Sequence, residues 1–130
     1  MKKQSTVTFK AIQSSWGIFI RIKASTSSFA GDASFTVESL SDNLFLRVNQ
    51  SWRLSELELE YLKNGLNSVL VHHPSEPTLI TIDEISFVDV DFQADALFWA
   101  ARMLAADLLG IEILGPRIEF DKQANRYLFA

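Results

Sequence analysis

The chain has 130 residues, of which 48% are hydrophobic, and it carries a formal net charge of -4 at pH 7. This is long enough to bury the core of one domain without disulfides or metal ions. Cysteine is absent, which excludes a disulfide framework, a thiolate nucleophile and a cysteine metal site. The acidic balance disfavours a nucleic-acid partner and favours a basic or neutral one.

The beginning of the chain does not resemble a secretion signal. Met1, Lys2 and Lys3 are followed by polar residues, and no stretch approaches the ~20 apolar residues of a membrane span. Repeats and linkers are not evident in the sequence either. We therefore expect a cytoplasmic protein with a single domain over residues 1–130.

Four strands are predicted before any helix. Val7–Ile12 and Trp16–Ala24 alternate apolar and polar residues on either side of a short polar turn, which is typical of an antiparallel hairpin. The serine-rich stretch Ser25–Asp32 is predicted to be a loop. Ala33–Glu38 and Asn43–Asn49 form a second predicted hairpin around turn-forming residues.

A helix is predicted to begin after Ser55, because Glu58 three residues later completes a capping box. Its apolar face comprises Leu59, Leu62, Leu66, Val69 and Leu70. Gly65 lies beside this face and would cost about 1 kcal/mol relative to alanine in a helix interior, which indicates close approach of a neighbouring element. Pro74 and Pro77 end the helix.

The second half of the chain is predicted to hold a strand, a helix and a hairpin. The strand spans Leu79–Val88 and changes phase at Asp83-Glu84, which indicates a bulge or tight turn. The helix is predicted to begin with Asp91 as its cap and to end at Gly110. Its leucines lie on one side and Trp99 with Met103 on another, so one packing partner cannot cover it.

The strands at Ile118–Phe120 and Tyr127–Phe129 complete the predicted order as ββββαβαββ. This order predicts an α+β domain with a mainly antiparallel sheet of five to seven strands and two helices packed on one face.

Part of the chain resembles the fourth domain of bacterial elongation factor G, which has the ribosomal protein S5 domain 2-like fold. The residues that carry the resemblance are Tyr61-Leu62-Lys63-Asn64-Gly65-Leu66, a proline-bearing loop with the strand at 79–88, and Asp91 followed by Ala96-Leu97-Phe98-Trp99-Ala100-Ala101. The resemblance implies the fold. Val88-Asp89-Val90 stands where that family has a glycine and a histidine, and the family's early glycine-rich signature has no counterpart, so the ribosomal function is not carried over.

No set of residues in the sequence predicts catalysis, a metal or a cofactor. His72 and His73 are adjacent, so their side chains diverge, whereas metal-binding pairs on helices are three or four residues apart. Asp89, Asp91 and Asp95 can be interpreted as an acid and base pair or magnesium ligands. The structural interpretation is the stronger one: Asp91 caps the helix, Asp95 lies in its first turn and Asp89 is a solvated loop residue. We therefore expect a protein that is not an enzyme.

Two sets of residues are candidates for binding. Phe19, Arg21 and Lys23 share one strand face and Phe45 and Arg47 another, which suits single-stranded nucleic acid or simply a solvated sheet face. The second set holds the candidates for a protein interface: Trp99, Met103 and Ala106 in one stripe, and Phe29 as the large apolar residue of the serine-rich stretch. Core packing against the first helix is the alternative for the stripe.

The leading hypothesis is a small non-catalytic protein that binds another protein, such as an inhibitor or an immunity-type factor. Its expected partner is a basic toxin or enzyme, and a homodimer is left open. An RNA- or ribosome-associated module that uses Arg21, Lys23 and Arg47 is the alternative.

Overall fold

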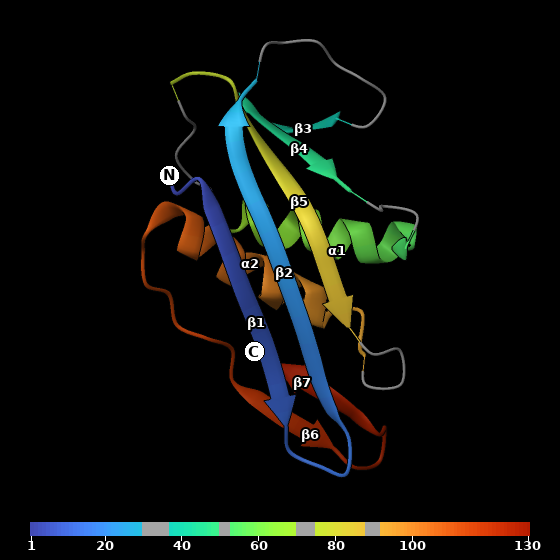
Figure 1. The fold of residues 1–130 in the computed structure, drawn as a ribbon. Helices are drawn as coiled ribbons and strands as arrows, with labels where there is room; N and C mark the ends of the chain where they lie inside the picture. Colours follow the sequence, from blue (N-terminus) through green and yellow to red (C-terminus); the bar gives the residue numbers. More distant parts are fainter. Residues whose placement is uncertain (30–36, 50–52, 70–74, 88–91) are drawn as a thin grey trace.

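The structure, a computed structural model, describes residues 1–29, 37–49, 53–69, 75–87 and 92–130, and Figure 1 shows a sheet with both helices on one of its faces. The elements in chain order are β1 (Gln4–Ile12), β2 (Gly17–Ser28), β3 (Val37–Ser41), β4 (Leu44–Val48), α1 (Glu56–Asn67), β5 (Thr78–Phe87), α2 (Ala96–Leu109), β6 (Ile118–Asp121) and β7 (Arg126–Phe129). The predicted α+β class and the predicted order of elements are confirmed.

The main sheet has five strands in the order β1-β2-β5-β4-β3. The pairs in it are antiparallel except β4 with β5, which run parallel because α1 carries the chain from one to the other. β6 and β7 form a separate two-stranded sheet behind the turn end of the β1–β2 hairpin (Figure 1).

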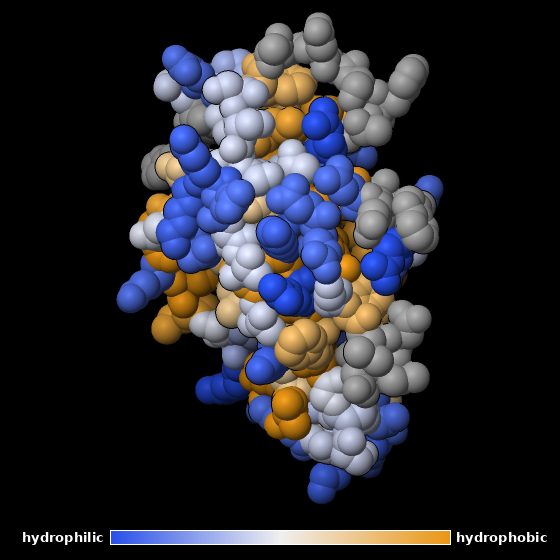
Figure 2. Space-filling model, in the orientation of Figure 1, coloured by the Kyte–Doolittle hydropathy of each residue, from blue (hydrophilic) through white to orange (hydrophobic). Residues whose placement is uncertain are grey.

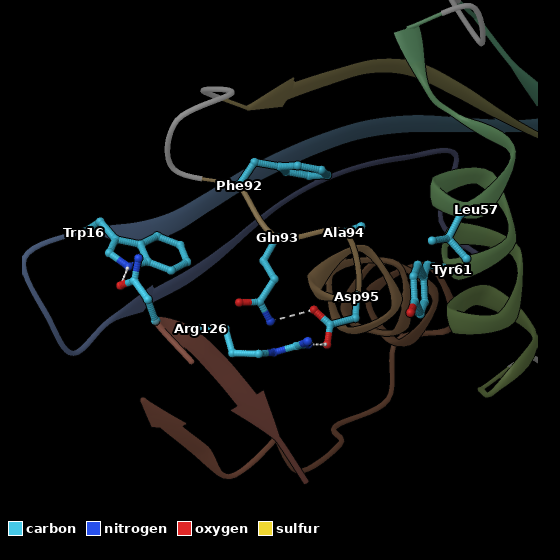
Figure 3. A pocket seen from close by; sticks show the side chains of 9 residues that line it. Trp16, Leu57, Tyr61, Phe92, Gln93, Ala94, Asp95 and Arg126 are labelled. Carbon is cyan, nitrogen blue, oxygen red and sulfur yellow. Dashed lines mark hydrogen bonds and ion pairs between the residues drawn. The ribbon is translucent and has the colours of Figure 1, made fainter. Parts of the chain in front are cut away.

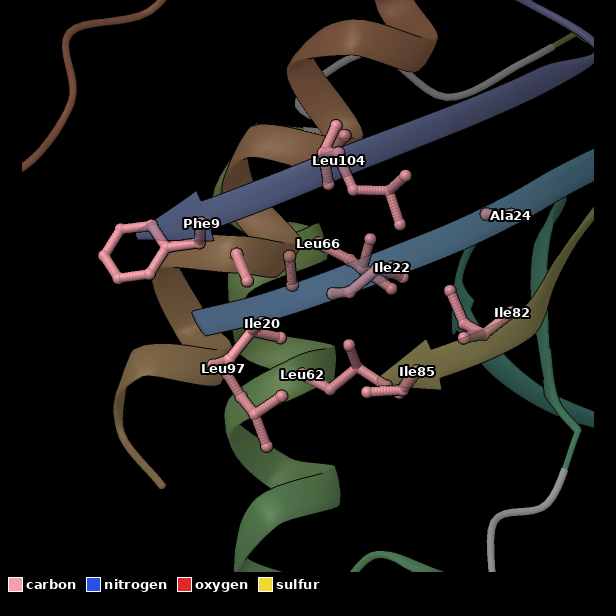
Figure 4. Packing of buried hydrophobic residues seen from close by; sticks show 14 of the residues in the cluster. Phe9, Ile20, Ile22, Ala24, Leu62, Leu66, Ile82, Ile85, Leu97 and Leu104 are labelled. Atoms are coloured by element: carbon pink, nitrogen blue, oxygen red, sulfur yellow. The ribbon is translucent and has the colours of Figure 1, made fainter. Parts of the chain in front are cut away.

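The core lies between the main sheet and the helices. Alternate residues of β2, including Ile20 and Ile22, are fully buried and meet leucines of α1 and α2, as Figure 4 shows. Burial of each such side chain contributes about 1.5–3 kcal/mol to stability. The intervening residues of β2 are exposed, so the opposite face of the sheet is not covered by a helix.

The start of α1 and the close approach at Gly65 agree with the sequence predictions. The Ser55 hydroxyl accepts a hydrogen bond from the Glu58 N–H at 3.1 Å, and the Glu58 carboxylate accepts one from the Ser55 N–H at 2.8 Å. A side chain at Gly65 would meet the carbonyl oxygen of Phe98 and, at 2.8 Å, the β-carbon of Ala101. The glycine therefore allows α1 and α2 to pack backbone against backbone.

The predicted start of α2 at Asp91 is wrong, and Asp91 itself lies outside the described residues. The helix begins at Ala96, and the N-cap residue Asp95 makes no side-chain capping bond. Its carboxylate is hydrogen-bonded to Gln93 and Arg126 instead, so a tertiary contact has replaced the cap. The predicted end at Gly110 is confirmed by its left-handed φ of 70°.

The predicted loop at Ser25–Asp32 is wrong for residues 25–28, which extend β2. They pair with residues 78–81 of β5, because backbone pairing with a central strand does not require apolar side chains. The change of phase in β5 is a bulge: Lys23 lies opposite Glu84 and Ala24 opposite Ile82, which leaves Asp83 as the extra residue. The predicted beginning of the third strand at Ala33 lies outside the described residues, and β3 continues to Ser41.

Candidate functional site

A pocket of about 670 Å³ lies at the start of α2, between α1, the β1–β2 turn and the β6–β7 turn. Figure 3 shows its lining, which consists of Trp16, Leu57, Tyr61, Phe92, Gln93, Ala94, Asp95, Asn125 and Arg126. It combines aromatic rings with an acid, a guanidinium and two amides, which is a composition common in ligand sites.

The polar side chains of this pocket form hydrogen bonds and an ion pair with other residues of the protein. The Gln93 amide nitrogen donates to Asp95 and to the Tyr127 carbonyl, both at 2.7 Å, and its oxygen accepts from the Tyr127 N–H at 2.8 Å. Arg126 forms an ion pair of 3.0 Å with Asp95, and the Trp16 indole donates to Asn125 at 2.9 Å. These contacts attach β7 to the start of α2, so we assign the pocket a structural role.

Tyr127 completes this attachment from inside the core. Its fully buried hydroxyl donates to the Trp16 carbonyl at 2.6 Å and accepts from the Gln13 N–H at 2.8 Å. Its ring meets Trp16 edge-on, with 5.0 Å between the centroids. The closing hairpin is thus held to the β1–β2 turn by hydrogen bonds and by aromatic packing.

Another concave region of the described residues is an apolar groove of about 450 Å³ between β1, α2 and the irregular segment 111–117. We call it the Trp99 groove, and its lining is Thr8, Phe9, Lys10, Trp99, Arg102, Met103, Ile113, Leu114, Gly115, Pro116 and Ile118. Leu114 is 91% exposed and Met103 is 38% exposed, although both are large apolar residues. The groove therefore leaves apolar surface in contact with water.

The four residues predicted for a protein interface do not form one surface. Trp99 is half-buried beside Phe129, with 6.3 Å between the ring centroids, and lines the groove together with Met103. Ala106 is only 4% exposed and belongs to the core. Phe29 lies elsewhere, with its ring 4.4 Å from that of Phe45. Trp99 packs against the core and also lines the groove, and its role in a protein interface stays a prediction.

Segment 111–117 was not among the candidates from the sequence. It carries Ile111, Ile113 and Leu114 directly before Gly115-Pro116, which is an apolar stretch where a loop would normally be polar. The apolar composition of this loop is the sequence signal that could have marked segment 111–117 as a candidate.

The residues predicted for nucleic acid lie on the open face of the main sheet, which Figure 2 shows to be largely hydrophilic at its centre. Phe19, Arg21 and Lys23 are exposed on β2, whereas Phe45 and Arg47 are half-buried on β4, beyond β5.

Two acids of β5 separate these two sets. Lys23 is paired in register with Glu84, and Asp83 accepts a hydrogen bond from Ser25 at 3.3 Å. Carboxylates between the cations reduce the attraction of this face for phosphates. Nucleic-acid binding here stays a prediction.

The residues considered for a metal site are only partly described. His72, His73, Asp89 and Asp91 lie outside the described residues. Within the described ranges, no group of three or more histidine, aspartate or glutamate side chains is placed to hold a metal ion.

Two ion-paired groups have shifted pKa values. The pKa of Asp107 is lowered from its usual 3.8, first by the hydroxyl of Ser5 and then by Lys2, which donates at 2.9 Å. The pKa of Lys63 is raised from 10.5 by hydrogen bonds to Glu60 and Glu38. The first cluster holds the start of the chain on α2, where the Lys2 N–H also donates to the Leu108 carbonyl at 2.8 Å.

A scan against protein-family models finds no match for this chain, and a search of curated proteins also finds none. No helix in the described ranges combines the length and the apolar character needed to cross a membrane.

Proposed function

We propose that the protein acts by binding another protein, and that the Trp99 groove is the binding surface. The observation that carries the proposal is the exposed apolar side chain of Leu114 in a groove that Trp99 and Met103 also line. Apolar patches of this kind, beside polar surface, are typical of protein interaction sites. Tryptophan and methionine are also enriched at such interfaces.

The groove suits a protein partner better than a small polar molecule. Its lining is mostly apolar, and the polar side chains that it does contain are Thr8, Lys10 and Arg102. A small ligand needs several convergent polar groups to fix its orientation, whereas a partner chain is positioned by a long line of contacts. Thr8, Phe9 and Lys10 of the nine-residue strand β1 line the groove, so β1 can supply part of such a line.

An inhibitor or an immunity-type factor is the form of this function that we propose, because such a protein acts by binding alone. We propose the cytoplasm as its compartment, since a chain without cysteine does not depend on an oxidising environment. The resemblance to the fourth domain of elongation factor G stays a prediction about the fold.

Site-specific photocrosslinking in the source cell tests the proposal. A benzophenone amino acid replaces Met103 in one variant and Leu128 in a matched control, because both are exposed apolar residues, at 38% and 45%, and Leu128 does not line the groove. We expect Met103 to give a discrete protein adduct that the control does not give. We also expect Leu114→Glu to abolish that adduct, because it places a charge in the apolar groove.

Three results would contradict the proposal. One is the absence of any adduct at position 103, another is an identical adduct pattern at position 128, and the third is an adduct that contains nucleic acid. Thermal unfolding of each variant controls for folding.

A further inference from the structure

We infer that the partner binds by adding a strand to the free edge of β1, through an extended segment that alternates apolar and acidic residues. This inference rests on the proposed function and specifies the chemistry of the partner. Three observations support it: the free edge of the sheet, the position of the groove along that edge, and the charge of the groove.

β1 is the first strand of the main sheet and, within the described part of the chain, its backbone pairs with β2 alone. In an edge strand, every second residue directs its N–H and C=O away from the sheet. β1 is nine residues long and contains no proline, so donors and acceptors alternate along its outer side, which segment 111–117 flanks across the Trp99 groove. An extended peptide can use such a row for main-chain hydrogen bonds.

The Trp99 groove lies along this same edge. Thr8, Phe9 and Lys10 of β1 form one side of it, and Trp99 with Met103 of α2 lies on another. An added strand would run about 4.8 Å from β1, and its side chains would alternate between the two faces of the sheet. One set would enter the groove, which requires apolar residues.

The other set of side chains would lie on the open face, beside Thr8 and Lys10. Lys10 is exposed, and its ammonium group lies 5.5 Å from the centre of the Phe19 ring. Arg102, the other cation of the groove, donates to the hydroxyl of Ser68 at 3.1 Å. Within the described ranges neither cation has a carboxylate partner, and the lining includes no acid. Lys10 therefore favours acidic residues among the side chains of the added segment that lie on the open face, although the net charge of the chain is negative.

A second copy of this chain that paired through its own β1 would not bring acidic residues to this edge. The sequence of β1 is QSTVTFKAI, which contains a lysine and no acid. Pairing of two β1 strands would add a second lysine and no carboxylate. We therefore assign the edge to a different protein.

Defined peptides test this inference on the full-length protein. The probe is a labelled ten-residue peptide that alternates valine and glutamate, and its matched control alternates valine and lysine. Two further versions of the acidic probe are N-methylated at every second amide, one in each phase. Affinity is measured by fluorescence anisotropy, and amide hydrogen exchange of β1 is followed by NMR.

We expect the acidic probe to bind at least tenfold more tightly than the lysine control. One of the two N-methylated peptides should lose at least tenfold in affinity and the other should bind like the unmethylated acidic probe, because only one set of peptide amides faces β1. Exchange of alternate β1 amides should slow on binding. Lys10→Glu should reverse the preference between the two probes, whereas Lys122→Glu, in the β6–β7 turn, should leave it unchanged.

Different results identify which inference fails. If both N-methylated phases bind like the parent and exchange of β1 is unchanged, strand addition is wrong. If the lysine control binds as tightly as the acidic probe, the assigned charge is wrong. If no probe binds while position 103 still crosslinks to a protein, the inference fails and the proposed function stands. If neither experiment detects binding, both are rejected.

Discussion

Replacement of Gly65 by alanine is the sharpest test of the helix packing. The new β-carbon would lie 2.8 Å from that of Ala101 and would collide with the carbonyl oxygen of Phe98. Because the second obstacle is backbone rather than the end of a flexible side chain, α1 and α2 must separate. Overpacking of this kind costs about 1–3 kcal/mol, and a backbone obstacle places the cost near the upper end.

The higher helix propensity of alanine offsets part of that cost. Alanine is more favourable than glycine in a helix interior by about 1 kcal/mol. We therefore expect Gly65→Ala to lower the free energy of unfolding by about 2 kcal/mol. An unfolding entropy of roughly 2.1 cal/mol/K per residue converts this to a fall in Tm of about 7 °C for a chain of 130 residues.

Urea unfolding followed by circular dichroism measures the change. Gly115→Ala is the matched control, because a β-carbon there meets no atom within 4 Å, and we expect its stability to stay within about 0.5 kcal/mol of the parent. A Gly65→Ala protein as stable as the parent, or more stable, would show that the helices are not in backbone contact at this position.

Three further substitutions test separate contacts. Ser55→Ala removes the capping box and should cost about 1 kcal/mol in urea unfolding, whereas an unchanged midpoint would mean that the cap does not form in solution. Tyr127→Phe removes the acceptor of the Gln13 N–H and one of two hydroxyl donors to the Trp16 carbonyl, which Ser14 also reaches at 3.0 Å. This loss should cost about 1–3 kcal/mol, and a loss below 0.5 kcal/mol, roughly the error of the method, would contradict it. Asp107→Asn should flatten the acid limb of a plot of Tm against pH. Since the folded pKa of Asp107 lies below its usual 3.8, the carboxylate contributes to the free energy of unfolding above pH 3.8, and this contribution is lost as the pH falls through the folded pKa. An unchanged acid limb in the Asp107→Asn variant would refute this role.

Local signals in the sequence predicted much of the fold. Ser55 and Glu58 form a cap through contacts within four residues, and Gly65 stands out because glycine is costly in a helix. The bulge in β5 was visible as a change of phase around Asp83. Each of these features depends on neighbours in the sequence or on an intrinsic cost of one residue.

Features that depend on distant residues were missed. The start of α2 was misplaced because Asp95 bonds with Arg126, 31 residues later in the chain, instead of capping the helix. The extension of β2 to Ser28 depends on its pairing with β5.

The Trp99 groove combines β1 with segments about a hundred residues later, so periodicity within one element could not show it. The sequence did single out Trp99 and Met103, because their side of the helix was apolar without an evident partner.

The position of β5 in the sheet has a consequence for synthesis of the protein. β5 lies between β2 and β4 and pairs with both, yet it begins only at Thr78. A lone two-stranded hairpin is marginally stable in water. During synthesis, the inner edges of the two early hairpins therefore stay unpaired until the strand that ends at Phe87 has left the ribosome. A pause in translation before that point would prolong the interval in which aggregation competes with folding.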